Sequence, residues 1–184
     1  MGIHIEDGAG SGKLTKVDSN NRLEVKAINV SSDEDINKRT EKVWSIPFED
    51  LNPAGDDDYV VYIQNTGDAV LQITDIRVSA TAATQIELHA VSGAASGGAN
   101  ISAVSRTVGS AAVPTATIQS GTDITGLTND GILFLIDIAT ANDTFQLKTS
   151  SRVRIPKGKA VALLVETGTA NISGVISLVE ENGD

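Results

Sequence analysis

The chain of 184 residues carries 14 Lys and Arg against 24 Asp and Glu, so its formal net charge is −10. This acidic balance argues against a nucleic-acid partner, because gripping a phosphate backbone needs a basic surface. The chain has no cysteine, which excludes disulfides, thiolate metal sites and cysteine nucleophiles together. The length suits one sizeable core with an appended arm or tail, and a second full domain would be cramped.

β-Branched residues dominate the composition. Val, Ile and Thr make up 52 of the 184 residues, whereas Leu reaches 12 and the aromatic residues six. This composition favours strands over helices. Apolar runs are too short to span a membrane, and the first residues carry Glu6 and Asp7 where a secretory signal would place lysines before an apolar run. The sequence therefore predicts an ordered all-β domain with no membrane partner and no secretory signal.

Residues 1–31 differ from the rest of the chain, because short alternating segments are separated by a Gly-rich turn and a polar turn. The expected strands of this segment cover residues 2–6, 13–17 and 22–27. The third strand alternates apolar and charged residues, so something must cover its apolar face. That cover is either the chain's own body or a neighbouring subunit in an assembly, and the residues alone leave both open.

A change of pattern separates this arm from the body of the chain. Residues 32–40 place acidic residues before basic ones, which a short helix would favour, and we expect a linker here. From residue 41 strands and turns alternate at intervals of about ten residues, a spacing typical of antiparallel sandwiches and barrels. Pro47 places its strand at an edge or in a linker, because proline lacks a donor for the ladder.

Three segments of the body carry specific expectations. Residues 59–64 and 70–79 flank a turn and are predicted to pair as a hairpin. Residues 92–131 are rich in Ser, Gly, Ala, Asn and Thr, which indicates long exposed loops with brief strands. The run Ile132–Ile138 is the most continuous apolar segment, and it predicts a strand buried on both sides near the centre of the domain.

No catalytic constellation emerges from the polar residues. The run Asp56–Asp58 lacks the ligand spacing of an EF-hand loop and is interpreted as a solvated turn. His89 would have to be the base of a Ser-His-Asp relay, but the chain has no Gly-x-Ser-x-Gly elbow. Glu87, Asp137 and Glu166 lie on expected strands without the spacing or aromatic platforms of a glycosidase. We therefore predict no enzyme, no cofactor and no metal site.

One dense basic patch stands out against the acidic background. It consists of four residues on one expected strand and the turn after it: Arg152, Arg154, Lys157 and Lys159. Such a patch is usually a solvated edge that discourages strand pairing. In an assembly the same patch can contact an acidic neighbour, so it is kept as a possible contact patch.

The order of these features resembles tailed-bacteriophage virion structural proteins of the capsid decoration, cement or head-fibre type. The residues that carry the resemblance are the Ile-His-Ile-Glu-Asp-Gly opening at 3–8, the Asp-Ser-Asn-Asn-Arg-Leu turn at 18–23, the strand Tyr59–Asn65 and the Ile-Pro-Lys-Gly turn at 155–158. The match is clearest in residues 3–30 and weaker in the body. These motifs are turn chemistry, so the resemblance implies a binding role and no reaction.

The resemblance implies a fold and a domain organisation. We expect an antiparallel β-sandwich of jelly-roll type over residues 41–184, preceded by an extended N-terminal arm of short hairpins over 1–31 and a linker over 32–40. The implied state is a homo-oligomer, with a trimer favoured. The implied location is the virion, assembled in the host cytoplasm.

The expected mechanism is docking of the arm on the major capsid protein or another virion protein, which decorates or cements the particle. The side chains expected to be buried against that partner are Ile3, Ile5, Leu14, Val17, Leu23 and Val25. The alternative is a receptor-binding or adhesin-like tail or fibre module, which would contact the host surface through the 92–131 loops.

Overall fold

The structure is a computed structural model that describes residues 41–181, with only the backbone described over residues 148–152. Eleven strands and no helix lie within this range, which confirms the all-β prediction. Their bounds are β1 (Val43–Leu51), β2 (Asp58–Asn65), β3 (Val70–Ala80), β4 (Thr84–Ser96), β5 (Ala99–Asn100), β6 (Val104–Ser105), β7 (Ala116–Ser120), β8 (Thr125–Ile138), β9 (Thr144–Ile155), β10 (Ala160–Val165) and β11 (Ile172–Glu181). Over these residues, no helix is found that is long and apolar enough to cross a membrane.

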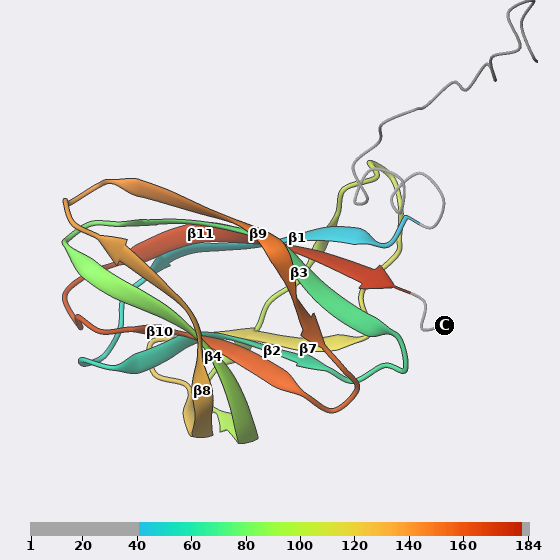
Figure 1. The fold of residues 1–184 in the computed structure, drawn as a ribbon, viewed down its shortest axis with the longest axis horizontal. Helices are drawn as coiled ribbons and strands as arrows, with labels where there is room; N and C mark the ends of the chain where they lie inside the picture. The colour runs from blue at the N-terminus through green and yellow to red at the C-terminus, as the bar shows by residue number, and fades with distance from the viewer. Residues whose placement is uncertain (1–40, 182–184) are drawn as a thin grey trace, which may run out of the picture. The chain divides into compact units, whose positions relative to one another are not determined.

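The strands form two antiparallel sheets that pack face to face as a sandwich (Figure 1). The five-stranded sheet has the order β6-β1-β11-β3-β9, and the six-stranded sheet has the order β5-β7-β2-β10-β4-β8. The first and second halves of the chain pair strand by strand, β1 with β11, β2 with β10, β3 with β9 and β4 with β8. Nearly every sheet contact is therefore made between segments far apart in sequence.

The main core fills the space between the two sheets, because alternate residues of each strand point inward. Ile46, Ile73, Ile86 and Ile176 are fully buried members of this cluster. Burial of each such aliphatic side chain contributes roughly 1.5–3 kcal/mol. A smaller cluster on the outer face of the six-stranded sheet joins Tyr62, Val91, Ile124, Ala160 and Ala162.

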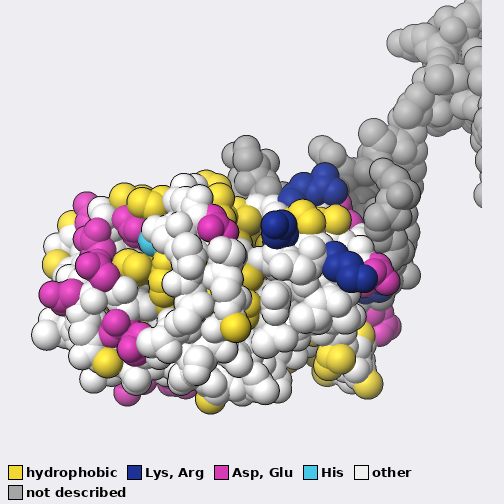
Figure 2. Space-filling model, turned by 90° about the horizontal axis from the view of Figure 1, so that it is seen from below, with side chains coloured by type: hydrophobic (Ala, Val, Ile, Leu, Met, Phe, Trp, Pro, Cys, Tyr) yellow, Lys and Arg dark blue, Asp and Glu magenta, His cyan; other side chains and the backbone are white. Residues whose placement is uncertain are grey.

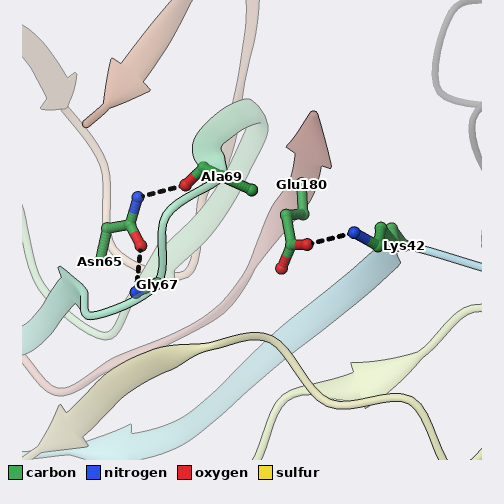
Figure 3. Close-up of polar contacts among 5 residues, drawn as sticks. All are labelled: Lys42, Asn65, Gly67, Ala69 and Glu180. Atoms are coloured by element: carbon green, nitrogen blue, oxygen red, sulfur yellow. Dashed lines mark hydrogen bonds and ion pairs between the residues drawn. The ribbon is translucent and has the colours of Figure 1, made fainter. Parts of the chain in front are cut away.

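β2 and β3 do not pair as a hairpin, so that prediction is wrong: β2 lies in the six-stranded sheet and β3 in the five-stranded one. The chain crosses between layers at Asn65, which is fully buried. The Asn65 side-chain amide donates to the carbonyl of Ala69 at 2.7 Å, and its side-chain oxygen accepts from the Gly67 N–H at 2.9 Å (Figure 3). The amide also donates to the carbonyl of Ile155 at 2.8 Å, which lies 90 residues further along the chain. These bonds hold the crossing turn without a cross-strand ladder.

One side of the sandwich, which we call the closed side, is covered by the insertion between β4 and β8. In this insertion β7 extends the six-stranded sheet beside β2, β5 pairs with β7, and β6 pairs with β1. The connection packs Ile101 and Ala103 against the main core, and the Trp44 indole N–H donates to the carbonyl of Ala112 at 2.9 Å. Pro47 lies beyond the short β6 pairing, on a part of β1 that pairs only with β11, as expected for an edge.

The opposite side, which we call the open side, is bounded by β8 and β9. β8 is the last strand of the six-stranded sheet and β9 the last of the five-stranded one. The prediction that Ile132–Ile138 is buried on both sides is therefore wrong. Ile136 and Ile138 face the core, whereas Ile132 is 54% exposed and Leu135 is 50% exposed. Leu135 alternates with Phe134 and Ile136, which pack in the main core, so it points to the outer face of the sheet, where it stays half exposed.

The two ends of the sandwich differ in charge. At one end, which we call the acidic end, the turns are joined by backbone bonds such as Thr81 N–H to Asn171 O and Asn142 N–H to Ala80 O. The segments that meet here carry no Lys or Arg, and their acidic residues are Glu49, Asp50, Asp56, Asp57, Asp58, Asp123, Asp137, Asp143 and Glu166. On the face drawn in Figure 2, most acidic side chains lie toward one end and most Lys and Arg side chains toward the other.

Candidate interaction surface

Residues 41 and 181 lie together at the other end of the sandwich, which we call the terminal end. Here β1 begins beside the last residues of β11, and the Lys42 ammonium contacts the Glu180 carboxylate at 2.5 Å (Figure 3). The six side chains expected to dock on a partner, Ile3, Ile5, Leu14, Val17, Leu23 and Val25, lie outside the described residues, as does the expected helix of 32–40. The described part of the chain therefore begins and ends at the terminal end of the sandwich.

The sequence-predicted basic patch is divided by its contacts. The side chain of Arg152 lies outside the described residues. Lys157 forms an exposed ion pair with Asp68, with 2.6 Å between the ammonium and a carboxylate oxygen. The Asp68 contact raises the pKa of Lys157, and the Lys157 contact lowers the pKa of Asp68. Lys157 therefore has an internal counter-charge, and the basic side chains of the patch that are described without an ion pair are Arg154 and Lys159.

Arg154 and Lys159 line a groove on the open side. Both are exposed, and within residues 41–181 neither forms an ion pair. The groove has a volume of about 570 Å³, and its walls include Asp130, Leu133, Phe134, Val153, Arg154 and Lys159. Basic groups come from β9 and the turn after it, while the carboxylate comes from β8, so this groove brings opposite charges and apolar side chains together.

Exposed apolar side chains continue the groove along both edge strands. Among the described residues, four of the exposed large hydrophobic side chains lie on β8 and β9: Ile132 (54%), Leu133 (41%), Leu135 (50%) and Phe145 (37%). Exposed large apolar residues on edge strands are a signature of an interaction surface. The open side is therefore the surface of the body best suited to contact another protein.

A buried polar chain lies on the outer face of the six-stranded sheet, on β2 and β4. The Tyr59 hydroxyl lies 2.8 Å from His89 Nδ1, and His89 Nε2 lies 2.5 Å from a Glu87 carboxylate oxygen. His89 and Glu87 are 2% and 8% exposed, and the rings of Tyr59 and His89 meet edge to face. Glu87 and His89 share a face because they are two residues apart on one strand.

The geometry leaves the Tyr59, His89 and Glu87 side chains little capacity for catalysis. Both imidazole nitrogens of His89 are engaged, so neither is free to take a proton from a substrate. Burial raises the pKa of Tyr59, with further contributions from the negative charges of Glu87 and Asp130. A raised pKa keeps the phenol neutral and makes it a weak nucleophile. The three side chains are best described as a buried polar network whose hydrogen bonds are satisfied.

The remaining carboxylates of the sequence analysis have structural roles or face solvent. Asp58 accepts a hydrogen bond from the Gly55 N–H at 2.6 Å, and Asp56 accepts one from the Gly168 N–H at 2.8 Å. Asp137 and Glu166 are exposed, whereas Glu87 is buried. Among the described residues, no group of three or more His, Cys, Asp or Glu side chains is arranged to hold a metal ion.

Sequence reasoning missed two features of this surface. It assigned His89 to a strand face without naming its partners, although Glu87 two residues earlier was a usable signal. It also placed Ile132–Ile138 in the centre of the sheet, so the apolar edge went unrecognised. The groove itself joins β8 to β9 and to the turn at 156–159, and no local pattern announces such a contact.

No protein-family model, curated protein or solved structure matches this chain.

Proposed function

We propose that the chain is a non-enzymatic phage virion structural protein that binds the capsid surface through residues 1–31 and decorates or cements the particle. Its partner in this proposal is the major capsid protein or another virion protein. The resemblance of residues 3–30 to decoration and head-fibre proteins motivates the proposal. The observation that carries it is the strand order of the body.

That strand order supports a jelly-roll assignment for the sandwich. The eight long strands are arranged as β1-β11-β3-β9 in one sheet and β2-β10-β4-β8 in the other. This is the order that results when one long antiparallel hairpin is wrapped into two layers, as in the two Greek keys of a jelly roll. Viral capsid domains and lectins use this architecture repeatedly. This shared architecture supports the proposal by fold-level analogy.

The uneven distribution of charge between the two ends of the body also favours attachment by one end. The chain enters the sandwich at the terminal end, where Lys42 contacts Glu180, and the carboxylates gather at the acidic end. A docking arm that precedes residue 41 is therefore connected to the body away from its most acidic turns. Such a body can project from a particle while its net negative charge keeps neighbouring bodies apart.

A non-enzymatic role is consistent with the polar network of β2 and β4. His89 is bonded through both ring nitrogens, and the phenol of Tyr59 has a raised pKa. The proposal accordingly needs no cofactor and no metal. It includes a homo-oligomer, with a trimer favoured, because several copies multiply weak docking contacts into durable attachment.

Co-sedimentation with capsids that lack the protein tests the arm. One variant of the full chain, Leu23→Asp/Val25→Asp, introduces charge on the expected apolar face of residues 22–27. The matched control, Glu24→Gln/Lys26→Gln, changes the opposite face of the same segment. We expect the first variant to lose at least tenfold in capsid affinity and the control to bind as the unmodified chain does, because docking buries only the apolar face.

Circular dichroism and thermal melting verify that both variants fold. Equal binding by the two variants at unchanged stability would refute docking through this face. Weak binding by both would mean that charge rather than apolar burial governs the contact, which also contradicts the proposal.

The adhesin-like alternative has one observation in its favour. The insertion of the closed side carries three exposed valines, Val104 (56%), Val108 (101%) and Val113 (73%). Under this alternative, host cells would bind the chain, and Val108→Asp/Val113→Asp would abolish that binding. Under the decoration proposal the same variant binds capsids normally, so one pair of measurements separates the two functions.

A further inference from the structure

β8 and β9 are long edge strands that share the open side. β8 spans Thr125–Ile138 and pairs only with β4, while β9 spans Thr144–Ile155 and pairs only with β3. Each therefore presents a row of backbone groups with no partner strand among residues 41–181. Proteins usually shorten, charge or cover such edges, because they are templates for pairing with another chain. On the closed side the insertion provides that cover, and on the open side nothing described does.

The charges of the two edges are opposite. β8 contains Asp130 and Asp137 and no basic residue. β9 contains no acidic residue, and its three bases in sequence are Lys148, Arg152 and Arg154, followed by Lys159 after the turn. The exposed Arg154 and Lys159 have no ion-pair partner among the described residues, although they share the groove with Asp130. Complementary charge is therefore available to a neighbour on both edges.

We propose that the open side is a self-association surface, in which the β8 edge of one copy contacts the β9 edge of the next copy. The apolar contribution comes from Ile132, Leu133 and Leu135 on β8 and from Phe145 on β9. The electrostatic contribution comes from the acidic β8 facing the basic β9. This surface lies wholly within the body, so the inference is independent of capsid docking by residues 1–31.

The topology favours a closed assembly around an axis parallel to the strands. β8 and β9 run in opposite directions on the same side of the sandwich, since a single turn joins them. Rotation about an axis parallel to the strands keeps each strand's direction, so β8 of one copy meets β9 of the next as an antiparallel neighbour. The same relation then repeats until the ring closes. The groove lined by Arg154 and Lys159 is part of the surface that each copy presents to its neighbour.

Pairing of like edges is disfavoured by the same charges. Two β8 edges placed side by side would bring Asp130 and Asp137 of both copies together, and two β9 edges would bring bases together. Like charges directly opposite one another on paired strands are destabilising. The copies therefore associate through unlike edges, which gives the contact a distinctive test.

The test exchanges the charges of one edge at a time in the full chain. One variant, Asp130→Lys/Asp137→Lys, makes both edges basic. The other, Arg154→Glu/Lys159→Glu, reverses the charge of the groove wall and leaves the β9 edge with equal numbers of acidic and basic residues, beside an acidic β8. Native mass spectrometry and light scattering measure the oligomeric state, with melting curves to verify folding. We expect the unmodified chain to form closed oligomers that weaken as salt rises, because salt screens exposed charges. We expect each variant alone to associate at least tenfold more weakly.

Mixing the two variants provides the decisive measurement. The basic β8 of one variant then meets a β9 whose charge is reversed at positions 154 and 159, and the acidic β8 of the other meets a basic β9, so we expect mixed oligomers that neither variant forms alone. Matched controls change net charge elsewhere: Glu49→Lys/Glu166→Lys makes the same change as the first variant at the acidic end, and Arg106→Glu on the closed side makes half the change of the second. These controls should assemble as the unmodified chain does.

Three results would overturn the inference. The first is an unmodified chain that remains a monomer at concentrations up to hundreds of micromolar. The second is normal self-association by either edge variant. The third is failure of the two folded variants to assemble when mixed, which would mean that the edges do not contact each other. None of these measurements involves capsids, so their failure is distinguishable from failure of the docking proposal.

Discussion

The closed and open sides of the sandwich both contain sheet edges, and the described residues cover those edges on the closed side alone. Both sides terminate two sheets, and both carry apolar residues near the free edge. On the closed side the chain covers its own edges with β5, β6 and β7, and the Trp44 indole holds the insertion through Ala112. On the open side β8 and β9 end the sheets, and Ile132 and Leu135 remain about half exposed.

This difference separates stability from interaction within one fold. An edge that is covered by the same chain contributes to folding, because its apolar side chains are buried in the folded state whatever the surroundings. An edge that is left open contributes only when something else covers it. Substitutions on the closed side should therefore change the free energy of unfolding, and substitutions on the open side should change association.

The largest expected effect is on the closed side, at Trp44. Its side chain is 1% exposed and its indole N–H donates to the Ala112 carbonyl. Trp44→Ala should lower the free energy of unfolding by about 3–5 kcal/mol, because it leaves a cavity and frees the insertion. Urea denaturation followed by circular dichroism measures this loss.

The matched substitution on the open side is Leu135→Ala, which should change the free energy of unfolding of the separated chain by no more than about 0.5 kcal/mol. The measurement is made at low concentration so that association does not contribute. Similar losses for the two variants would break the comparison, since they would mean that the open edge is already covered within one chain.

The sequence predicted the content of the fold better than its arrangement. β-Branched composition and regular turns suffice for an all-β sandwich, and Pro47 correctly indicated an edge because its missing N–H is a local property. The run Ile132–Ile138 was misplaced because hydrophobicity reports how much a strand can bury and says nothing of which partners exist. The crossing at Asn65 was mistaken for a hairpin turn for a similar reason, since turn chemistry does not specify the sheet that the chain enters next.

The interaction surface was accessible to sequence reasoning only in part. The cluster at 152–159 was predicted as a possible contact patch, but the pairing of Lys157 with Asp68 joins positions 89 residues apart. The opposing acidic wall from Asp130 was not foreseen, because β8 and β9 lie in different sheets and meet only through the fold. Spacing within one strand was informative, as Glu87 and His89 show, and relations between strands required the structure.

A smaller effect is expected from the polar chain beside the open edge. Burial raises the pKa of Tyr59 above its ordinary value of about 10, so the unfolded chain loses the phenolic proton first as pH rises. Stability from this group is therefore fully present below about pH 10 and falls as pH rises toward the folded-state pKa. Unfolding measured from pH 8 to pH 11.5 should show a steeper alkaline loss for the unmodified chain than for Tyr59→Phe.

The other ionisable groups are the same in both proteins, so the difference between the two curves isolates Tyr59. Identical curves would contradict a buried phenol bonded to His89. A difference would sharpen the comparison of the two sides, because it would show that a polar network stabilises the sheet next to the open edge, where Trp44 has no counterpart.

The smallest effect, none that can be measured, is expected from Lys157→Ala. The Lys157 and Asp68 side chains are 65% and 92% exposed, and solvent screens such a pair strongly. The variant should therefore have the same melting temperature as the unmodified chain. Because Lys157 already has an internal counter-charge, the variant should also retain the oligomeric state. Arg154→Ala, an equal loss of one positive charge two strand positions before Pro156, should weaken association while leaving melting unchanged. If Lys157→Ala dissociated the oligomer as strongly as Arg154→Ala, the contact would depend on the total positive charge at this end and not on the side chains that line the groove. That result would contradict a specific contact through the open edge.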